Sequence, residues 1–177
     1  GGGRLSWNGL PPIELTEEQK FIFDTKGWLA IPGVLSDSDI TEMRDFAYQL
    51  TKDPESIPED QRSTIGGPLQ RLTDHPIVVG FMNEFVAYDP LASEDGYGFR
   101  HEGSFLTIRP WGPGNKEFKP HGGRGIFNFP GNHHTYHAMP DRVNSGLTRC
   151  VFELNEIREG DGGTLFLSGS HKGAFAR

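Results

Sequence analysis

The sequence predicts an α+β protein in which helices come first and strands follow. Two observations indicate this order. Apolar residues recur at helical spacing in the first half, whereas after about Ser93 glycine and aromatic residues become frequent and apolar residues gather in short runs between turns. Helices followed by consecutive strands are typical of an α+β arrangement, with the strands building a sandwich or a barrel.

The length of 177 residues predicts one domain, large enough to bury a core. A stretch rich in Gly and Pro occupies residues 1–12, and we expect it to be poorly ordered. The single domain therefore covers residues 13–177. Because the chain begins Gly-Gly-Gly and stops just after a turn, we interpret it as a fragment.

The first helix is expected at about residues 17–24. Thr16 and Gln19 have the spacing of a capping box, which marks the start of a helix. A strand is expected next, over residues 28–31, closed by a Pro-Gly pair.

Two further helices are expected before residue 93. Ser36 caps the first of them, and its apolar residues recur at the spacing of a core-facing stripe: Ile40, Met43, Phe46, Ala47 and Leu50. Residues 51–70 are rich in Pro, Asp and Gly and predict a loop. Asp74 and Pro76 begin the other helix. Its inner residues are expected to be Ile77, Val78, Phe81, Met82 and Phe85.

Four short apolar runs predict the strands of the second half. They are residues 105–108, 126–129, 150–154 and 165–167. The glycines of the Gly-Asp-Gly-Gly sequence at 160–163 predict a tight turn, because glycine adopts positive φ without strain.

Composition excludes several classes of partner. The net charge of −7 and the lack of a basic run argue against nucleic acid and against an anionic membrane. The single cysteine, Cys150, excludes an internal disulfide framework and is typical of a reducing compartment. No apolar run approaches the length of a membrane span, and the first residues lack a signal-peptide pattern. We therefore expect a cytoplasmic protein.

Four segments stand out as motifs. Residues 23–35 read Phe-Asp-Thr-Lys-Gly-Trp-Leu-Ala-Ile-Pro-Gly-Val-Leu, and residues 74–77 read Asp-His-Pro-Ile. His121 and two glycines follow a Pro/Gly-rich bend, and residues 169–172 read Gly-Ser-His-Lys. In this order the segments resemble those of the phytanoyl-CoA dioxygenase-like family. The resemblance implies N-terminal helices packed on a double-stranded β-helix (jelly-roll) core, incomplete at the C-terminus.

The resemblance also implies an activity. Members of this family are non-haem Fe(II)/2-oxoglutarate-dependent dioxygenases, so the expected function is hydroxylation of a small organic substrate with O₂. Iron in such enzymes is held by two His and one carboxylate. His121 matches the first of these ligands, whereas the second His and the Arg that pairs with 2-oxoglutarate would lie beyond Arg177.

The chain departs from the family at the carboxylate, because position 123 is Gly where the family has Asp or Glu. Three interpretations stay open. A carboxylate from elsewhere, such as Glu102 or Asp141, completes the site; a halide replaces it, as in similar halogenases; or the metal site is lost and a non-catalytic jelly-roll binding module remains. A cupin-like zinc or manganese enzyme is a further alternative.

Four side chains near His121 are candidates to bind 2-oxoglutarate: Thr107, Arg109, Asn128 and Arg149. An Arg buried on a strand needs an anionic partner, which the cofactor would supply. Equally, Arg149 could pair with Glu153 or Glu156 in the sheet.

Four other histidines are left out of the metal site. His133, His134 and His137 have flanks typical of a solvated loop, and the alternatives are a second metal site and contact with the substrate. His171 lies in the Gly-Ser-His-Lys turn, which in the family orders the rim of the barrel.

Overall fold

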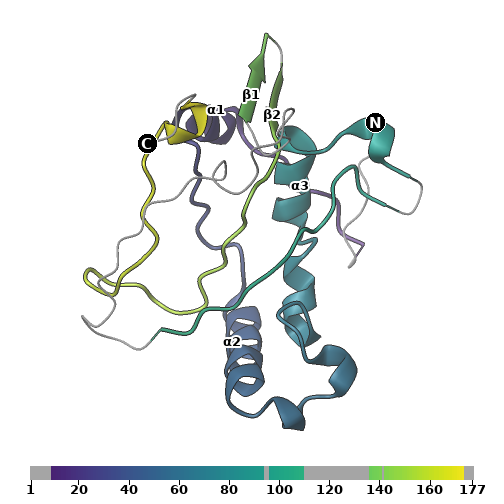
Figure 1. Cartoon of the computed structure of the whole chain (residues 1–177), viewed down its shortest axis with the longest axis vertical. Coiled ribbons are helices and arrows are strands. Elements are labelled where there is room, and N and C mark those ends of the chain that lie inside the picture. Colours follow the sequence, from purple (N-terminus) through teal and green to yellow (C-terminus); the bar gives the residue numbers. More distant parts are fainter. Residues whose placement is uncertain (1–8, 94–95, 110–135, 141, 174–177) are drawn as a thin grey trace.

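The structure is a computed structural model that describes residues 9–93, 96–109, 136–140 and 142–173 (Figure 1). Over these residues it contains three α-helices, one β-hairpin and several short 3₁₀ helices. The α-helices are α1 (Glu17–Lys26), α2 (Asp37–Lys52) and α3 (Pro76–Phe85), and the hairpin strands are β1 (Tyr136–Met139) and β2 (Arg142–Ser145). The 3₁₀ helices are η1 (Pro54–Ser56), η2 (Glu59–Gln61), η3 (Gly67–Leu72), η4 (Asp89–Leu91) and η5 (Ser170–Lys172).

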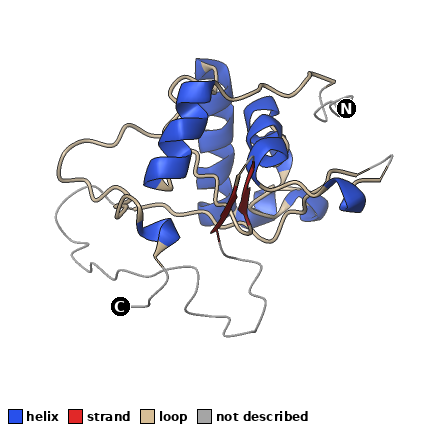
Figure 2. Ribbon diagram, turned by 90° about the horizontal axis from the view of Figure 1, so that it is seen from above, coloured by secondary structure: helices blue, strands red, loops and turns tan. Residues whose placement is uncertain are grey.

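The expected jelly-roll core is wrong for the described residues, which are mostly helical with a single two-stranded antiparallel sheet. The apolar runs at 105–108, 150–154 and 165–167 form no strand, and the run at 126–129 lies outside the described residues. Figure 2 shows that, outside the helices and the hairpin, the described chain runs as loops. A strand needs a partner for its backbone groups, and short runs without alternation specify no register.

Helix α1 begins and ends where local chemistry favours it. The Thr16 side chain accepts a hydrogen bond from the Gln19 backbone, and the Gln19 side chain accepts one from the Thr16 backbone, at 3.1 and 2.9 Å. The predicted capping box is thus confirmed. Gly27 ends the helix with φ of 78°, the left-handed conformation that glycine adopts without a steric penalty.

The main core joins α1, α3 and the hairpin at one end of the molecule (Figure 1). The Phe23 ring lies 4.7 Å from Phe81 and 4.6 Å from Phe85, centroid to centroid. Tyr136 of β1 and Val143 of β2 pack against the same cluster. The hairpin therefore gains its stability from a helical core rather than from a larger sheet.

Helix α2 lies toward the other end of the molecule and packs on η1 and η3 (Figure 1). Ser36 caps it as predicted, accepting a hydrogen bond from the Asp39 backbone at 3.1 Å. Met43 is 1 % exposed on its inner face. Arg71 of η3 binds Asp39 at 2.7 Å and also contacts Glu42, which joins η3 to the start of α2.

Several local predictions differ from the structure. No strand forms over 28–31, and the loop expected over 51–70 includes η1, η2 and the start of η3. Helix α3 forms as predicted, but His75 rather than Asp74 caps it, accepting from the Ile77 backbone at 3.3 Å. His137 lies in β1, where a loop was expected.

Candidate functional site

The residues predicted to hold iron and 2-oxoglutarate are only partly described. His121, the expected metal ligand, and Asn128 lie outside the described residues. Thr107 is exposed on a segment without helix or strand. Arg109 donates to the Gly162 carbonyl at 2.9 Å, and the Arg149 guanidinium lies over the Phe105 ring, 5.0 Å from its centroid.

Neither arginine occupies the environment predicted for it. Arg109 and Arg149 are exposed rather than buried on strands, so desolvation does not oblige either to take an anionic partner. Glu156, proposed as a sheet partner of Arg149, accepts from Arg158 at 2.7 Å instead.

The acids considered as iron ligands give no donor set in the part of the chain that the structure describes. Glu102 pairs with Arg100 at 3.1 Å, and Asp141 lies outside the described residues. Over the described ranges, no three His, Cys, Asp or Glu side chains gather closely enough to hold a metal ion. These residues by themselves therefore do not fit iron.

Polar side chains converge instead at the C-terminal end of α1. We call this cluster the α1 junction, and it consists of Asp24, Gly27, Tyr136, His171 and Lys172. The Tyr136 hydroxyl donates to the Asp24 carboxylate at 2.5 Å, and the Lys172 ammonium lies 3.1 Å from the same oxygen. Segments separated by more than a hundred residues thus meet on one carboxylate.

His171 fills the space beside Gly27. Its Nε2 lies 2.8 Å from the Asp24 carbonyl oxygen, which can only accept, so Nε2 carries the proton. The ring meets Tyr136 edge to face, with centroids 4.6 Å apart. A Cβ at position 27 would lie 2.3 Å from Nδ1 of His171. Glycine is therefore required both for its positive φ and for the room it leaves.

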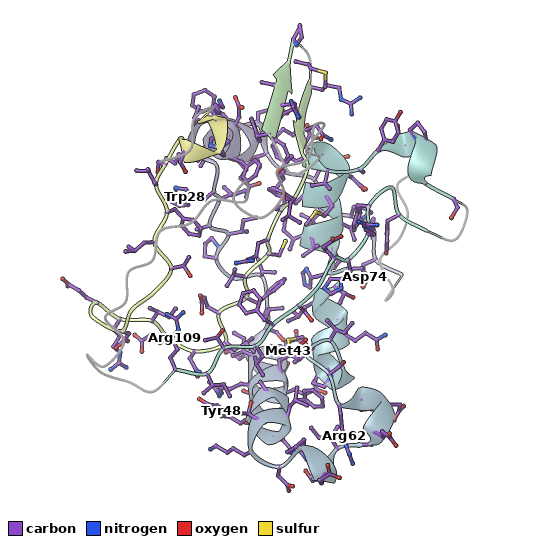
Figure 3. The ribbon with its side chains drawn as sticks, in the orientation of Figure 1. Trp28, Met43, Tyr48, Arg62, Asp74 and Arg109 are labelled. Carbon is purple, nitrogen blue, oxygen red and sulfur yellow. The ribbon has the colours of Figure 1, made fainter. Side chains whose placement is uncertain are left out.

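The segment that carries His171 is fastened to α1 at two more points. The Gly169 amide donates to the Lys26 carbonyl at 2.8 Å, and the Trp28 indole donates to the Ser168 hydroxyl at 2.9 Å. Trp28 also stacks on Phe166 at 5.8 Å. In Figure 3, Trp28 is well separated from Arg109. The contact between Trp28 and Ser168 is therefore distinct from the position of Arg109, one of the described 2-oxoglutarate candidates.

Charge and burial set the protonation states in the α1 junction. The Tyr136 hydrogen bond, helped by Lys172, lowers the pKa of Asp24 below its ordinary value against the opposing effect of burial. Burial, then the bond to Asp24, raises the pKa of Tyr136 well above its usual range. At neutral pH Asp24 is a carboxylate and Tyr136 a donor. Tyr136 does not act as a base.

A hollow of about 570 Å³ lies beside η2 and η3. Its lining includes mostly polar or small residues: Asp60, Gln61, Ser63, Ile65, Gly66, Gly67 and Gln70. Of the described 2-oxoglutarate candidates, Thr107, Arg109 and Arg149 do not line it. The described lining contains one carboxylate, Asp60, and no base or cation beside it. It therefore offers few groups for catalysis or for binding a charged ligand.

Tyr136 was not predicted as a site residue, and Asp24 was noted only as part of the opening motif. Asp24 and the Gly-Ser-His-Lys turn were both recognised within motifs, but nothing in their spacing placed them in contact. The available signal for a hairpin was an aromatic residue, Tyr136, a few positions before a Pro-Asp pair that favours a turn.

None of the helices that the structure describes combines the length and apolar character that a membrane crossing requires.

Comparison of the chain with models of protein families, with curated proteins and with solved structures found no match.

Proposed function

We propose that the protein acts as an Fe(II)/2-oxoglutarate-dependent dioxygenase that hydroxylates a small organic substrate. The observation that carries the proposal is that segments which resemble one oxygenase family also contact one another. Asp24, in the opening motif, binds His171 of the Gly-Ser-His-Lys turn at 2.8 Å. Phe23 of the same motif packs on Phe81 of the helix that follows His75 and Pro76, at 4.7 Å.

His121 is the one iron ligand that we assign. The described residues do not supply a donor set, so the other ligands are left unassigned and no reaction step through iron is derived. What the described chain contributes is positioning. The α1 junction holds the opening motif and the Gly-Ser-His-Lys turn together, while the 2-oxoglutarate candidates Thr107 and Arg109 lie on a segment without helix or strand.

The test is iron uptake and turnover by the full-length protein. Under anaerobic conditions with Fe(II), we expect about one iron per chain, and with 2-oxoglutarate and O₂ we expect succinate to form. His121→Ala should weaken iron uptake at least about tenfold, since it removes a direct ligand. His101→Ala is the matched control, because His101 is exposed and has no proposed role. Equal iron uptake by wild type and His121→Ala would contradict the proposal.

Gly at position 123 favours two alternatives to a hydroxylase with the usual carboxylate ligand. Without a carboxylate at that position, a halide can complete the metal site, or the chain can be a non-catalytic binding module. Repeating the uptake measurement with and without chloride separates them. Chloride-dependent iron binding indicates a halogenase-like site, whereas no iron under either condition indicates a binding module.

A further inference from the structure

The segment over residues 164–173 lies across the end of α1, and we call it the strap. Burial of apolar side chains contributes little to its attachment, since Leu165 is 76 % and Leu167 73 % exposed. The contacts that fasten the strap therefore lie in its polar C-terminal half and at Trp28.

Asp24 is the centre of those contacts. Its carboxylate binds Lys172 of the strap and Tyr136 of the hairpin, while its backbone carbonyl accepts from His171. A charged acceptor makes stronger hydrogen bonds than a neutral one, so two elements depend on one negative charge. Neutral Asp24 would lose its ion pair with Lys172 outright.

Among the described groups that face Asp24, none is a second carboxylate. From the strap it meets His171 and Lys172, and from β1 it meets Tyr136. On α1 itself the nearest cations are engaged elsewhere: the Lys26 ammonium lies over the Trp28 ring at 5.1 Å, and Lys20 pairs with Glu17 and with Glu84 of α3. No described carboxylate of the strap or hairpin takes the place of Asp24 at this contact.

We propose that the strap is an acid-releasable element, held on α1 by the negative charge of Asp24 and freed when that carboxylate is protonated. Protonation breaks the Lys172 ion pair and weakens the Tyr136 bond, and the remaining contacts of the strap with Trp28 and with the α1 backbone are lost as the strap leaves. The hairpin stays on the core through its apolar side chains, so the strap moves alone.

The direction of the pH dependence follows from the geometry. The pKa of Asp24 is lowered in the folded chain, chiefly by the Tyr136 hydrogen bond. Stabilisation by a carboxylate of lowered pKa is complete above its ordinary value, 3.8, and is lost as pH falls through the folded-state pKa. The strap is therefore attached at neutral pH, and it is released only as pH falls below the ordinary value toward the lowered pKa of Asp24.

The experiment is an NMR titration of the full chain from pH 7 downward. The Trp28 indole N–H, assigned with Trp28→Phe, reports attachment because it donates to Ser168 of the strap. We expect it to shift to the position of a solvent-exposed indole while signals of α2 persist. Disappearance of strap and α2 signals at the same pH would overturn the proposal, because the acid step would then be global unfolding.

Two variants and a control sharpen the titration. Asp24→Asn and Lys172→Met should each give the released indole signal at every pH, because each removes the ion pair between Asp24 and the strap. Asp39→Asn is the matched control: Asp39 also has a lowered pKa, chiefly from Ser36, but it lies on α2. It should leave the midpoint unchanged. The proposal is wrong if Lys172→Met keeps the wild-type midpoint, or if a folded Asp24→Asn variant keeps the acid step.

Discussion

The described residues before Ser93 and those after Gly96 differ in how their apolar side chains are covered. In the first region Val79 is fully buried and Met43 is 1 % exposed. In the second region Leu165, Phe105 and Val151 are 76, 61 and 51 % exposed. The difference teaches that helices can bury an apolar face against a few neighbours, whereas apolar strand-like runs stay uncovered until other strands pair with them.

The hairpin lies between these two cases. Its register is defined, with Tyr136 opposite Ser145 and Met139 opposite Arg142. It holds this register because Tyr136 meets Phe23 at 6.3 Å and binds Asp24. A two-stranded hairpin is marginal alone and becomes stable when it packs on helices.

The largest expected effect is in the helical core. Phe23→Ala should lower the free energy of unfolding by about 3–5 kcal/mol, because it removes the ring that contacts Phe81 and Phe85. Phe21→Ala is the matched control on the same helix, since Phe21 is 68 % exposed, and it should change stability by less than about 0.5 kcal/mol. Urea unfolding followed by circular dichroism measures both. Similar losses in the two variants would show that α1 does not bury the face assigned to it.

A smaller effect is expected where the two regions touch. Gly27→Ala and Gly33→Ala both place Ala at positive φ, 78° and 69°, and each should cost about 1–2 kcal/mol for that reason. Gly27→Ala should cost about 1–3 kcal/mol more, because its Cβ collides with His171 while nothing lies within 4 Å at Gly33.

The same denaturation experiment checks this difference, and a double variant isolates its cause. His171→Ala in the Gly27→Ala background should remove the excess cost over Gly33→Ala. An excess that survives His171→Ala contradicts the contact between the strap and α1.

The smallest effect is expected in the exposed runs. Leu165→Ala should change the free energy of unfolding by less than about 0.5 kcal/mol, because that side chain is 76 % exposed. Leu69→Ala is a suitable comparison, since Leu69 is 4 % exposed and should cost about 2–5 kcal/mol. A cost at Leu165 near that at Leu69 would mean that the second region has a packed core of its own.

The elements that could be predicted from the sequence are those with local signals. Thr16 with Gln19, Ser36 and Pro76 each mark a helix start through contacts within four residues, and all three helices form. The predicted jelly roll, which is wrong for the described residues, had no such local signal, because strand pairing depends on partners distant in the sequence. Its prediction rested on resemblance and on apolar runs that satisfy several structures equally well.

The α1 junction shows the same limit at the level of the site. The Tyr136 hydroxyl reaches Asp24 across 112 positions of sequence, and the Trp28 indole reaches Ser168 across 140. Periodicity and caps carry no information about such contacts. Resemblance placed Asp24 and His171 within motifs but did not state that they touch.

Hydrogen exchange along the full chain at neutral pH tests the contrast between the two regions most directly. We predict slow exchange for the amides of α2 and α3 beyond the first turn, which donate within the helix, and fast exchange for residues 105–108, 150–154 and 165–167. Slow exchange in those three runs, equal to that of α3, would contradict the account, because it would require the strand pairing that the structure lacks over its described residues.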